Sequence, residues 1–176
     1  FFPDTYVFPR GTSDLEILRQ AYRAMEKRLG AAWAERQPDV PLRSPYEALI
    51  LASIVEKETG RPEDRSMVAA VLTNRLRIGM RLQTDPTVIY GLGTAFDGNL
   101  RKRDLLADTP YNTYTREGLP PTPIAMPGLA SIEATLRPAP SSPLYFVARG
   151  DGSSEFSRTL EDHNRAVTKY QRSGKR

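Results

Sequence analysis

Two glutamates, Glu56 and Glu58, lie near the end of an apolar stretch that spans residues 44–60. If this stretch is helical, successive side chains turn by about 100°, so the two carboxyl groups point about 200° apart. Glu58 falls on the face of the helix that Leu51 and Ile54 occupy. Glu56 falls beyond the edge of that apolar arc. Glu58 is therefore the acid that points in the same direction as the core-facing residues.

A carboxyl group on the buried face of a helix is suited to acid catalysis. An ionised carboxylate is costly there unless it is paired, and the loss of contact with water raises its pKa. A raised pKa is what a general acid needs at neutral pH. Periodicity alone leaves two other interpretations open, because Glu58 lies in the last turn of the helix. The side chain could reach solvent there, or it could pair with a buried arginine.

The helix that carries Glu58 has clear start and stop signals. Ser44 is a good N-cap, Pro45 suits the first helical position, and Glu47 stands where a capping box requires an acid. At the other end, Gly60 can adopt the left-handed conformation that ends a helix, and Pro62 prevents continuation. The signals predict nearly four turns of helix ending beside Glu58.

Composition narrows the chemistry that the chain can support. Its 176 residues suit one domain with a substantial core, and 26% charged with 39% hydrophobic residues is an ordinary globular composition. The absence of cysteine excludes disulfides and thiolate metal sites. A single histidine, His163, disfavours a histidine-rich zinc site and limits Ser-His-Asp catalysis. The net charge of +4 is a weak indication of an anionic partner.

No run of 18 apolar residues is present, which excludes a membrane-spanning helix from this stretch of chain, and no signal peptide is visible. The sequence starts abruptly with Phe1, Phe2 and Pro3, within what reads as structured sequence. We therefore expect a fragment of a longer protein.

The hydrophobic pattern predicts a mostly helical α+β fold with a small antiparallel hairpin near its end. The expected helices cover residues 14–36, 45–59, 62–77, 86–90, 99–108, 129–137 and 160–171. Strands are expected at 144–149 and 155–158, joined by a turn at 150–153. Residues 1–10 should lie extended against the core, and residues 173–176 should fray.

Several polar residues on these elements keep more than one interpretation. Asp85 reads first as the N-cap of the short helix that Pro86 begins. His163 lies on the last helix, where we expect it on the surface or in a structural hydrogen bond. Asn74 and Arg75 lie in the last turns of their helix, either exposed or facing a cleft, and the pattern does not decide between these.

Residues 109–128 form the longest stretch without a pattern, and a loop of this length is usually functional or disordered. Its tyrosines and apolar residues disfavour disorder, and its prolines stiffen it, so we interpret it as a rigid wall. Tyr111, Asn112 and Tyr114 combine flat aromatic faces with an amide. That combination suits sugar rings and their hydroxyl groups, although the signal is weak on its own.

Three segments together carry a family resemblance. They are LASIVEKET at 51–59, NRLRIGMRLQTDPTVIYG at 74–91, and YNTY at 111–114 with GLPP at 118–121. The segments FPDTY at 2–6 and YFVA at 145–148, with the pair at 163–164, match as well. On these residues the chain resembles the YceG-like (MltG) endolytic murein transglycosylases of bacteria over nearly its whole length.

The resemblance implies a lysozyme-like catalytic domain that occupies residues 1–176, in which a helix delivers one glutamate into a glycan cleft. The family's acid matches Glu58. Such enzymes cleave the bond between N-acetylmuramic acid and N-acetylglucosamine in peptidoglycan. The sugar's own 6-hydroxyl captures the reacting centre, so Glu58 acts first as acid and then as base, and a 1,6-anhydromuramyl end remains. No metal ion and no cofactor is implied.

The cleft around Glu58 is expected to be lined by polar and aromatic residues of the matching segments. The candidates for substrate binding are Gln83, Asp85, Tyr90, Tyr111, Asn112 and Tyr114. Three alternatives stay open: a muramidase that hydrolyses the same bond with water, a non-catalytic peptidoglycan-binding module, and a nucleic-acid binder, which only the basic charge favours.

The family resemblance also implies partners and a place in the cell. The substrate would be peptidoglycan glycan strands, with peptidoglycan synthases as possible neighbours and no nucleic acid. The family carries an N-terminal membrane anchor and a LysM-like region, both absent from this sequence. The full protein is therefore expected on the inner membrane, with its catalytic domain facing the periplasm or cell exterior.

Overall fold

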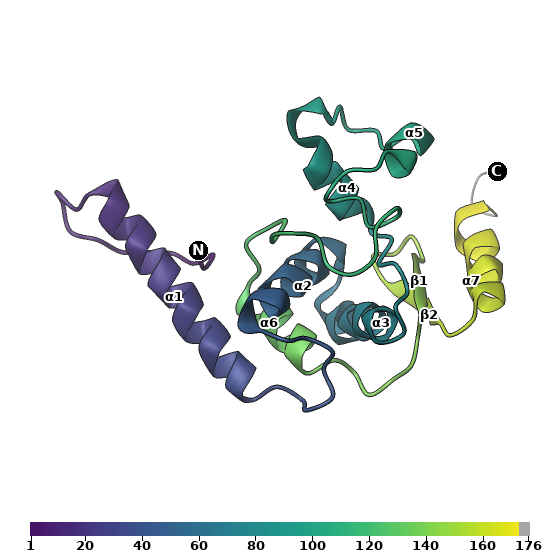
Figure 1. Cartoon of the computed structure of the whole chain (residues 1–176), viewed down its shortest axis with the longest axis horizontal. Helices are drawn as coiled ribbons and strands as arrows, with labels where there is room; N and C mark the ends of the chain where they lie inside the picture. Colours follow the sequence, from purple (N-terminus) through teal and green to yellow (C-terminus); the bar gives the residue numbers. More distant parts are fainter. Residues whose placement is uncertain (173–176) are drawn as a thin grey trace.

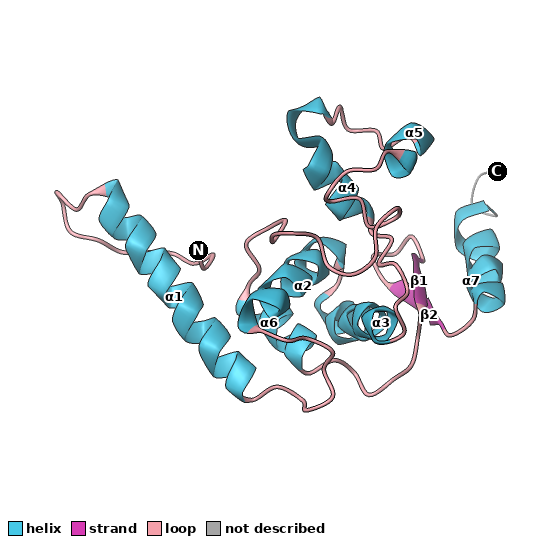
Figure 2. Cartoon of the chain, in the orientation of Figure 1, coloured by secondary structure: helices cyan, strands magenta, loops and turns pink. Residues whose placement is uncertain are grey.

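The computed structural model describes residues 1–172, within which helices make up most of the fold and one two-stranded sheet lies to one side (Figure 1 and Figure 2). The α-helices are α1 Asp14–Ala34, α2 Pro45–Glu58, α3 Arg65–Arg77, α4 Asp85–Leu92, α5 Lys102–Leu106, α6 Leu129–Leu136 and α7 Leu160–Val167. The strands are β1 Tyr145–Ala148 and β2 Ser154–Ser157. This confirms a mostly helical α+β chain with a small antiparallel hairpin, whereas its likeness to lysozyme stays a prediction.

Helix α2 lies at the centre of the molecule and packs against α1, α3, α4 and α6 (Figure 1). Residues 50–55 are all buried, so this part of α2 is covered on every side and not only along the expected arc. Its polar Ser53 is satisfied because its hydroxyl donates to the carbonyl of Ile50 (2.7 Å). The first turn, with the exposed Tyr46, and the last turn, which ends at Glu58, lie outside this core.

The caps of α2 differ in detail from the prediction. The backbone N–H of Glu47 donates to the Ser44 hydroxyl (3.2 Å), but the Glu47 carboxylate accepts from the N–H of Arg43 (2.7 Å), so the capping box is half formed. At the other end, Thr59 is extended and Gly60 has no positive φ. The expected left-handed ending is therefore wrong, because the chain leaves the helix through Thr59.

Helix α1 and the chain before it form an arm on one side of the molecule (Figure 1). The arm is tied together where the N–H of Phe2 donates to the carbonyl of Ala21 (2.9 Å), and the guanidinium of Arg28 lies 4.0 Å from the Phe2 ring centre. Only Phe2 of the first ten residues is buried, and Val7 is 90% exposed. The expectation that residues 1–10 lie against the core therefore holds for Phe2 alone.

The hairpin pairs β1 with β2 in an antiparallel register that places Phe146 opposite Phe156. Gly150 and Gly152 in the turn have φ values of 92° and 87°, a region that glycine enters without steric cost. Helix α7 packs against both strands. The hairpin thus carries α7 to the side of the molecule opposite α1 (Figure 1).

Some boundaries differ from those expected. Helix α4 begins at Asp85 itself with Thr84 at the cap position, so Asp85 is not the N-cap. Residues 62–64 form a 3₁₀ turn before α3, and residues 168–172 form a π-type turn that extends α7. The predicted fraying at 173–176 lies outside the described residues.

The long loop at 109–128 is fixed by buried hydrogen bonds, in keeping with the expected rigid wall. The N–H of Ile124 donates to the Ser53 hydroxyl on α2 (2.9 Å). The Asn112 amide donates to the carbonyls of Asp104, Leu105 and Ala107, at 3.2, 3.0 and 2.7 Å. These bonds hold both ends of the loop against helices.

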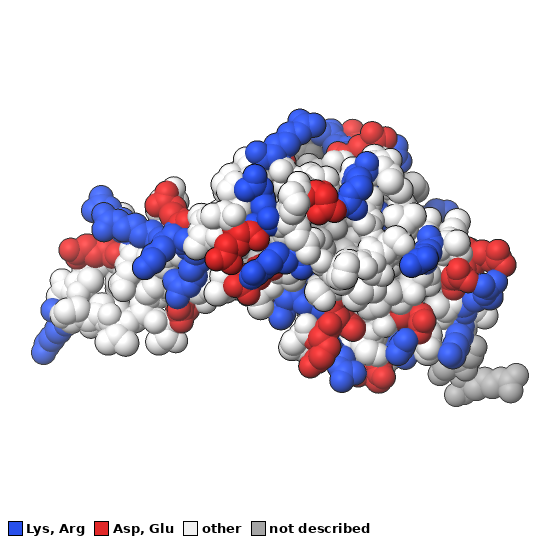
Figure 3. All heavy atoms as spheres, turned by 90° about the horizontal axis from the view of Figure 1, so that it is seen from below, with Lys and Arg blue, Asp and Glu red and all other residues white. Residues whose placement is uncertain are grey.

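The surface carries charges of both signs. On the face that Figure 3 shows, basic and acidic side chains are interspersed rather than gathered by sign. Within residues 1–172, no helix combines the length and the apolar content that crossing a bilayer requires.

Candidate active site

A cavity of about 520 Å³ opens where the end of α2, helix α3, the start of α4, strand β1 and helix α7 meet. Segments far apart in the sequence contribute its polar and aromatic lining. These residues are Glu58, Arg75, Gln83, Asp85, Tyr114, Tyr145, Phe146, His163 and Gln171. Four of them, Glu58, Gln83, Asp85 and Tyr114, are residues that the sequence analysis selected.

Glu58 is the last residue of α2, and its half-buried side chain lines the cavity. Its pKa is raised from 4.5 to about 7, chiefly by burial and then by the nearby Asp85 carboxylate, while the charge of Arg75 opposes the shift. Among the side chains that the structure describes, residues 1–171, none forms a hydrogen bond or an ion pair with the Glu58 carboxyl. The Glu58 carboxyl is thus neither ion-paired nor freely solvated. It is a shielded acid, about half protonated at neutral pH, that is open to a ligand.

Glu56 has a structural role on the other side of the same helix. Its carboxylate accepts from the N–H of Gly128 (3.0 Å) and from the hydroxyl of Ser131 (2.6 Å). Gly128 is the N-cap residue of α6, so the Glu56 carboxylate lies at the end of that helix where negative charge is favourable. Of the two glutamates, only Glu58 lines the cavity.

Asp85 and Tyr114 form one unit on the cavity wall. The Tyr114 hydroxyl donates to the Asp85 carboxylate at 2.5 Å. Burial raises the pKa of Tyr114, and the hydrogen bond to Asp85 raises it further, so Tyr114 keeps its proton. The N–H of Tyr114 in turn donates to the Asn112 side-chain oxygen (2.8 Å), which fixes the backbone of Tyr114 within the loop.

Gln83 enters the cavity from a backbone conformation that side chains rarely adopt. It is the one residue other than glycine with positive φ in the described chain, at 49°. Two backbone hydrogen bonds to Thr113 hold this conformation. The N–H of Gln83 donates to the Thr113 carbonyl (3.1 Å), and the N–H of Thr84 donates to the Thr113 hydroxyl (3.0 Å). Such strain persists where the surrounding structure enforces it, often at functional sites.

The opposite wall contains Arg75, Tyr145 and His163, none of which was among the predicted site residues. The imidazole of His163 stacks on Tyr145 with ring centres 5.3 Å apart, and the Arg75 guanidinium lies 5.4 Å from the Tyr145 ring centre. The His163 Nδ1 is buried without a hydrogen-bond partner. Burial lowers the pKa of His163 and the charge of Arg75 lowers it further, so the imidazole is neutral. His163 is therefore half-buried at the cavity rather than freely exposed, and among the described residues its Nδ1 makes no structural hydrogen bond.

One of these residues could have been found from the sequence. Arg75 lies three residues after Leu72 and four after Val71, both buried on α3. The same helical geometry that selected Glu58 therefore places Arg75 on a buried stripe. No comparable signal marks His163 or Tyr145, since the docking of α7 and the hairpin decides where they lie.

Three predicted substrate-binding residues do not line this cavity. Asn112 is fully buried, and its amide bonds the carbonyls and the N–H described above, so it holds the loop in place. A substrate-binding role for Asn112 stays a prediction. The Tyr111 hydroxyl shares a hydrogen bond with Thr122 (2.8 Å), and its ring packs on Tyr90 at 4.9 Å. Glycan contact by the exposed Tyr90 and half-buried Tyr111 stays a prediction.

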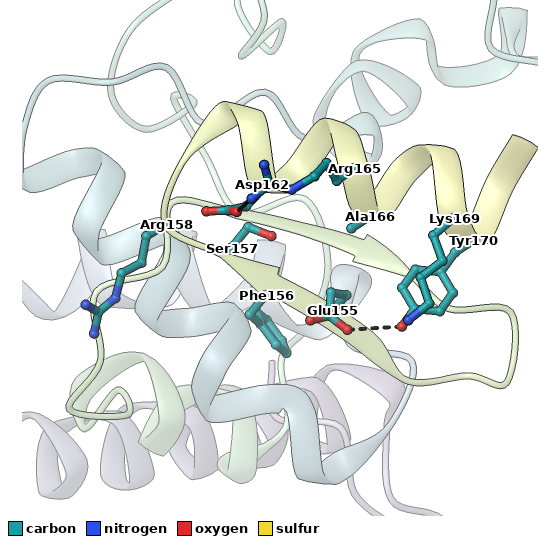
Figure 4. Close-up of a pocket in the computed structure, with 9 residues that line it drawn as sticks. All are labelled: Glu155, Phe156, Ser157, Arg158, Asp162, Arg165, Ala166, Lys169 and Tyr170. Atoms are coloured by element: carbon teal, nitrogen blue, oxygen red, sulfur yellow. Dashed lines mark hydrogen bonds and ion pairs between the residues drawn. The ribbon is translucent and has the colours of Figure 1, made fainter.

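A second cavity, of about 390 Å³, lies between β2 and α7 (Figure 4). Its polar groups are largely paired with each other. The Tyr170 hydroxyl donates to the Glu155 carboxylate (3.2 Å), and Arg165 forms an ion pair with Asp162. Figure 4 shows Arg158 at its edge, pointing away from the other lining residues. It contains no shielded acid comparable to Glu58.

A single shielded carboxyl at the end of a central helix, in a cavity with polar and aromatic walls, defines a site for acid–base chemistry on a polar substrate. Comparison with known proteins identifies the family. The chain belongs to the YceG-like family, whose pattern it matches over residues 1–169. Among the described residues, no group of acids and histidines is arranged to hold a metal ion.

Relatives with an established name share much of this sequence. The endolytic murein transglycosylase of Bacillus subtilis (strain 168) is 40% identical over 171 residues, covering 96% of this chain and 46% of that protein. The protein of the same name from Streptococcus pneumoniae serotype 2 (strain D39) is 33% identical over 175 residues, covering 96% of this chain and 31% of that protein. This chain thus spans less than half the length of each.

A solved structure shares the fold. The 2.6 Å crystal structure of a YceG-like protein from Listeria monocytogenes matches with a TM-score of 0.75 at 39% identity. The match covers 93% of this chain and 52% of that one.

Proposed function

We propose that this chain is the catalytic part of an endolytic peptidoglycan lytic transglycosylase, with Glu58 as its single acid–base residue. The observation that carries the proposal is the environment of Glu58: half-buried, with a pKa of about 7, unpaired, and open to a cavity of about 520 Å³. The names of the B. subtilis and S. pneumoniae relatives support the same reaction class.

In the proposed mechanism, protonated Glu58 donates its proton to the oxygen that links N-acetylmuramic acid to the next N-acetylglucosamine. The bond breaks through an oxocarbenium-like transition state. The 6-hydroxyl of the same muramyl residue attacks its anomeric carbon, and Glu58, now a carboxylate, accepts the hydroxyl proton. An intramolecular nucleophile has a large effective concentration, so no second carboxylate is needed to activate water.

Asp85 gives the hydrolytic alternative one specific observation in its favour. It places a second carboxyl group in the cavity, as glycosidases that use two carboxyl groups require. In the transglycosylase proposal, Asp85 instead holds Tyr114 and, by its negative charge, favours the protonated form of Glu58. The two functions differ in their products, since a 1,6-anhydro end is one water lighter than a hydrolysed end.

The deciding experiment is digestion of purified peptidoglycan sacculi by the purified chain, followed by mass spectrometry of the released fragments. Anhydromuramyl ends would support the transglycosylase. Reducing muramyl ends would show a water-using muramidase, and binding to sacculi without any release would show a non-catalytic module.

The resemblance to the family extends the proposal to the whole protein. It would be anchored in the inner membrane with this part facing the periplasm or cell exterior, and it would act on peptidoglycan beside the synthases, with no nucleic-acid partner. Protease treatment of intact and permeabilised cells tests the orientation. Digestion of this region only after permeabilisation of the inner membrane would contradict it.

A further inference from the structure

Among residues 1–171, whose side chains the structure describes, Arg75 is the only charged residue that is buried, with 7% of its surface exposed. Two backbone carbonyls fix its guanidinium. Nε donates to the carbonyl of Leu144 at 2.7 Å, and Nη1 donates to that of Leu82 at 2.6 Å. The planar group is therefore held in one orientation between α3, the segment before α4, and the start of β1.

Two features leave Arg75 available for a ligand. Nη2 has no hydrogen-bond partner among the described residues, while Arg75 is one of the residues that line the cavity. No carboxylate of the described chain lies within 4.0 Å of its nitrogens, in contrast to the surface ion pairs of Arg28 and Arg77. The carboxyl group whose charge acts on it is that of Glu58, which has a raised pKa of about 7.

A buried guanidinium without an anionic partner is unusual, because burying an unpaired charge destabilises the folded state. The fork of an arginine matches the two oxygens of a carboxylate, and each nitrogen also donates well to an amide carbonyl. The Tyr145 ring lies 5.4 Å from the guanidinium, and His163 stacks on that ring. Among the described residues, Nη2 of Arg75 is therefore left to donate to an oxygen acceptor of a ligand in the cavity.

We propose that Arg75 binds the 3-O-lactyl group of the muramyl residue, and so lets the site distinguish N-acetylmuramic acid from N-acetylglucosamine. This inference rests on the proposed function, which places a muramyl residue beside Glu58 in the same cavity. The lactyl group ends in a carboxylate in peptide-free strands and in an amide carbonyl where a stem peptide is attached. It is the one substituent that the neighbouring sugar lacks, and in peptide-free strands it is the one anionic group.

The test is a double-mutant-type cycle that combines substitution of Arg75 with modification of the lactyl group. Every chain carries Glu58→Gln so that no turnover occurs. The ligands are peptide-free glycan strands of equal length, with the lactyl carboxyls either free or reduced to primary alcohols. Dissociation constants are measured by calorimetry for Glu58→Gln alone and with Arg75→Gln or Arg75→Lys added. Arg77→Gln on the same helix is the matched control, because Arg77 contacts Asp39 outside the cavity.

With Arg75 present, reduction of the lactyl carboxyls should weaken binding by about tenfold or more, the usual worth of a hydrogen bond to a charged group. With Arg75→Gln, the same reduction should cost less than about twofold, and Arg77→Gln should behave like its parent. Arg75→Lys keeps the charge without the fork and should give an intermediate loss.

The outcomes separate the inference from the function on which it rests. A parent chain that binds neither strand overturns the proposed function together with this inference. A parent that binds both strands equally overturns this inference alone, even if both Arg75 variants fail to fold. An equal loss for both strands in a folded Arg75→Gln chain would show that Arg75 acts only on structure, and would also overturn it.

Discussion

The Glu58 carboxyl is poised between its two protonation states by its surroundings. Burial and the Asp85 carboxylate together raise its pKa to about 7, against the opposing charge of Arg75. A group that donates and then recovers one proton works best when its pKa lies near the working pH. The three residues come from α2, α3 and α4, so the tuning depends on how these helices meet.

The pH dependence of activity should follow Glu58. The reaction begins from the protonated acid, so kcat/KM should fall as the pH rises through about 7.

Asp85→Asn removes a negative charge that favours protonation of Glu58 and keeps an acceptor for Tyr114, so the falling limb of the pH profile should move to lower pH. Asp108→Asn, in an exposed ion pair with Arg116, is the control and should leave the limb unmoved. A limb that stays in place or moves upward in Asp85→Asn would contradict this tuning.

The same shift makes Glu58 a source of instability at high pH. Because its folded pKa of about 7 exceeds its ordinary value of 4.5, its contribution to stability is full below pH 4.5 and is lost as the pH rises through 7. Glu58→Gln has no proton to lose. The unfolding free energy of Glu58→Gln relative to the parent should therefore rise by about 3 kcal/mol between pH 4 and pH 9. Urea unfolding at both pH values measures this, with an unchanged slope as the control for two-state behaviour. A difference that does not vary with pH would contradict the raised pKa.

At the scale of elements, the wall of the site depends on one hydroxyl in the core. Ser53 is fully buried, and its oxygen accepts from the N–H of Ile124, which holds the loop at 109–128 against α2. The hydrogen bond from the Tyr114 hydroxyl to the Asp85 carboxylate then connects this loop to α4 at the cavity wall.

Ser53→Ala should lower the unfolding free energy by about 1–3 kcal/mol, because it leaves the buried N–H of Ile124 without a partner. Ser142→Ala, at an exposed position without a side-chain hydrogen bond in the described chain, should stay within about 0.5 kcal/mol. Chemical denaturation measures both values. Equal stability of Ser53→Ala and the parent would show that the loop is held by other contacts.

How far the sequence predicts the site differs between elements. Start and stop signals located α2, and helical geometry selected Glu58 over Glu56 for the cavity side. The same geometry applied to α3 would have selected Arg75. It could not show that α7 brings His163 to the cavity, because a helical pattern reveals which face is buried but not what that face contacts. The sequence pattern could not show that Asn112 is buried, because its amide donates to three carbonyls of the segment before it only once the loop has closed.

On the scale of the whole molecule, the site is made where distant parts of the chain converge. Its lining comes from residues between Glu58 and Gln171, while α1 and the first ten residues stay apart on the other side (Figure 1). The fold class was predictable because most helices are amphipathic or well capped. The convergence was not, since it depends on loop closures that no local pattern records.

The measurement that tests the central claim most directly compares Glu58→Gln with Glu56→Gln. Both remove one carboxyl from α2, but only Glu58 lines the cavity, whereas Glu56 binds Gly128 and Ser131. Release of anhydromuramyl ends from sacculi should fall by roughly 10²–10⁴-fold or more in Glu58→Gln. Glu56→Gln should keep most activity, with thermal melts confirming that both fold. Near-normal release by folded Glu58→Gln, or selective loss in Glu56→Gln, would contradict the assignment of Glu58 as the acid.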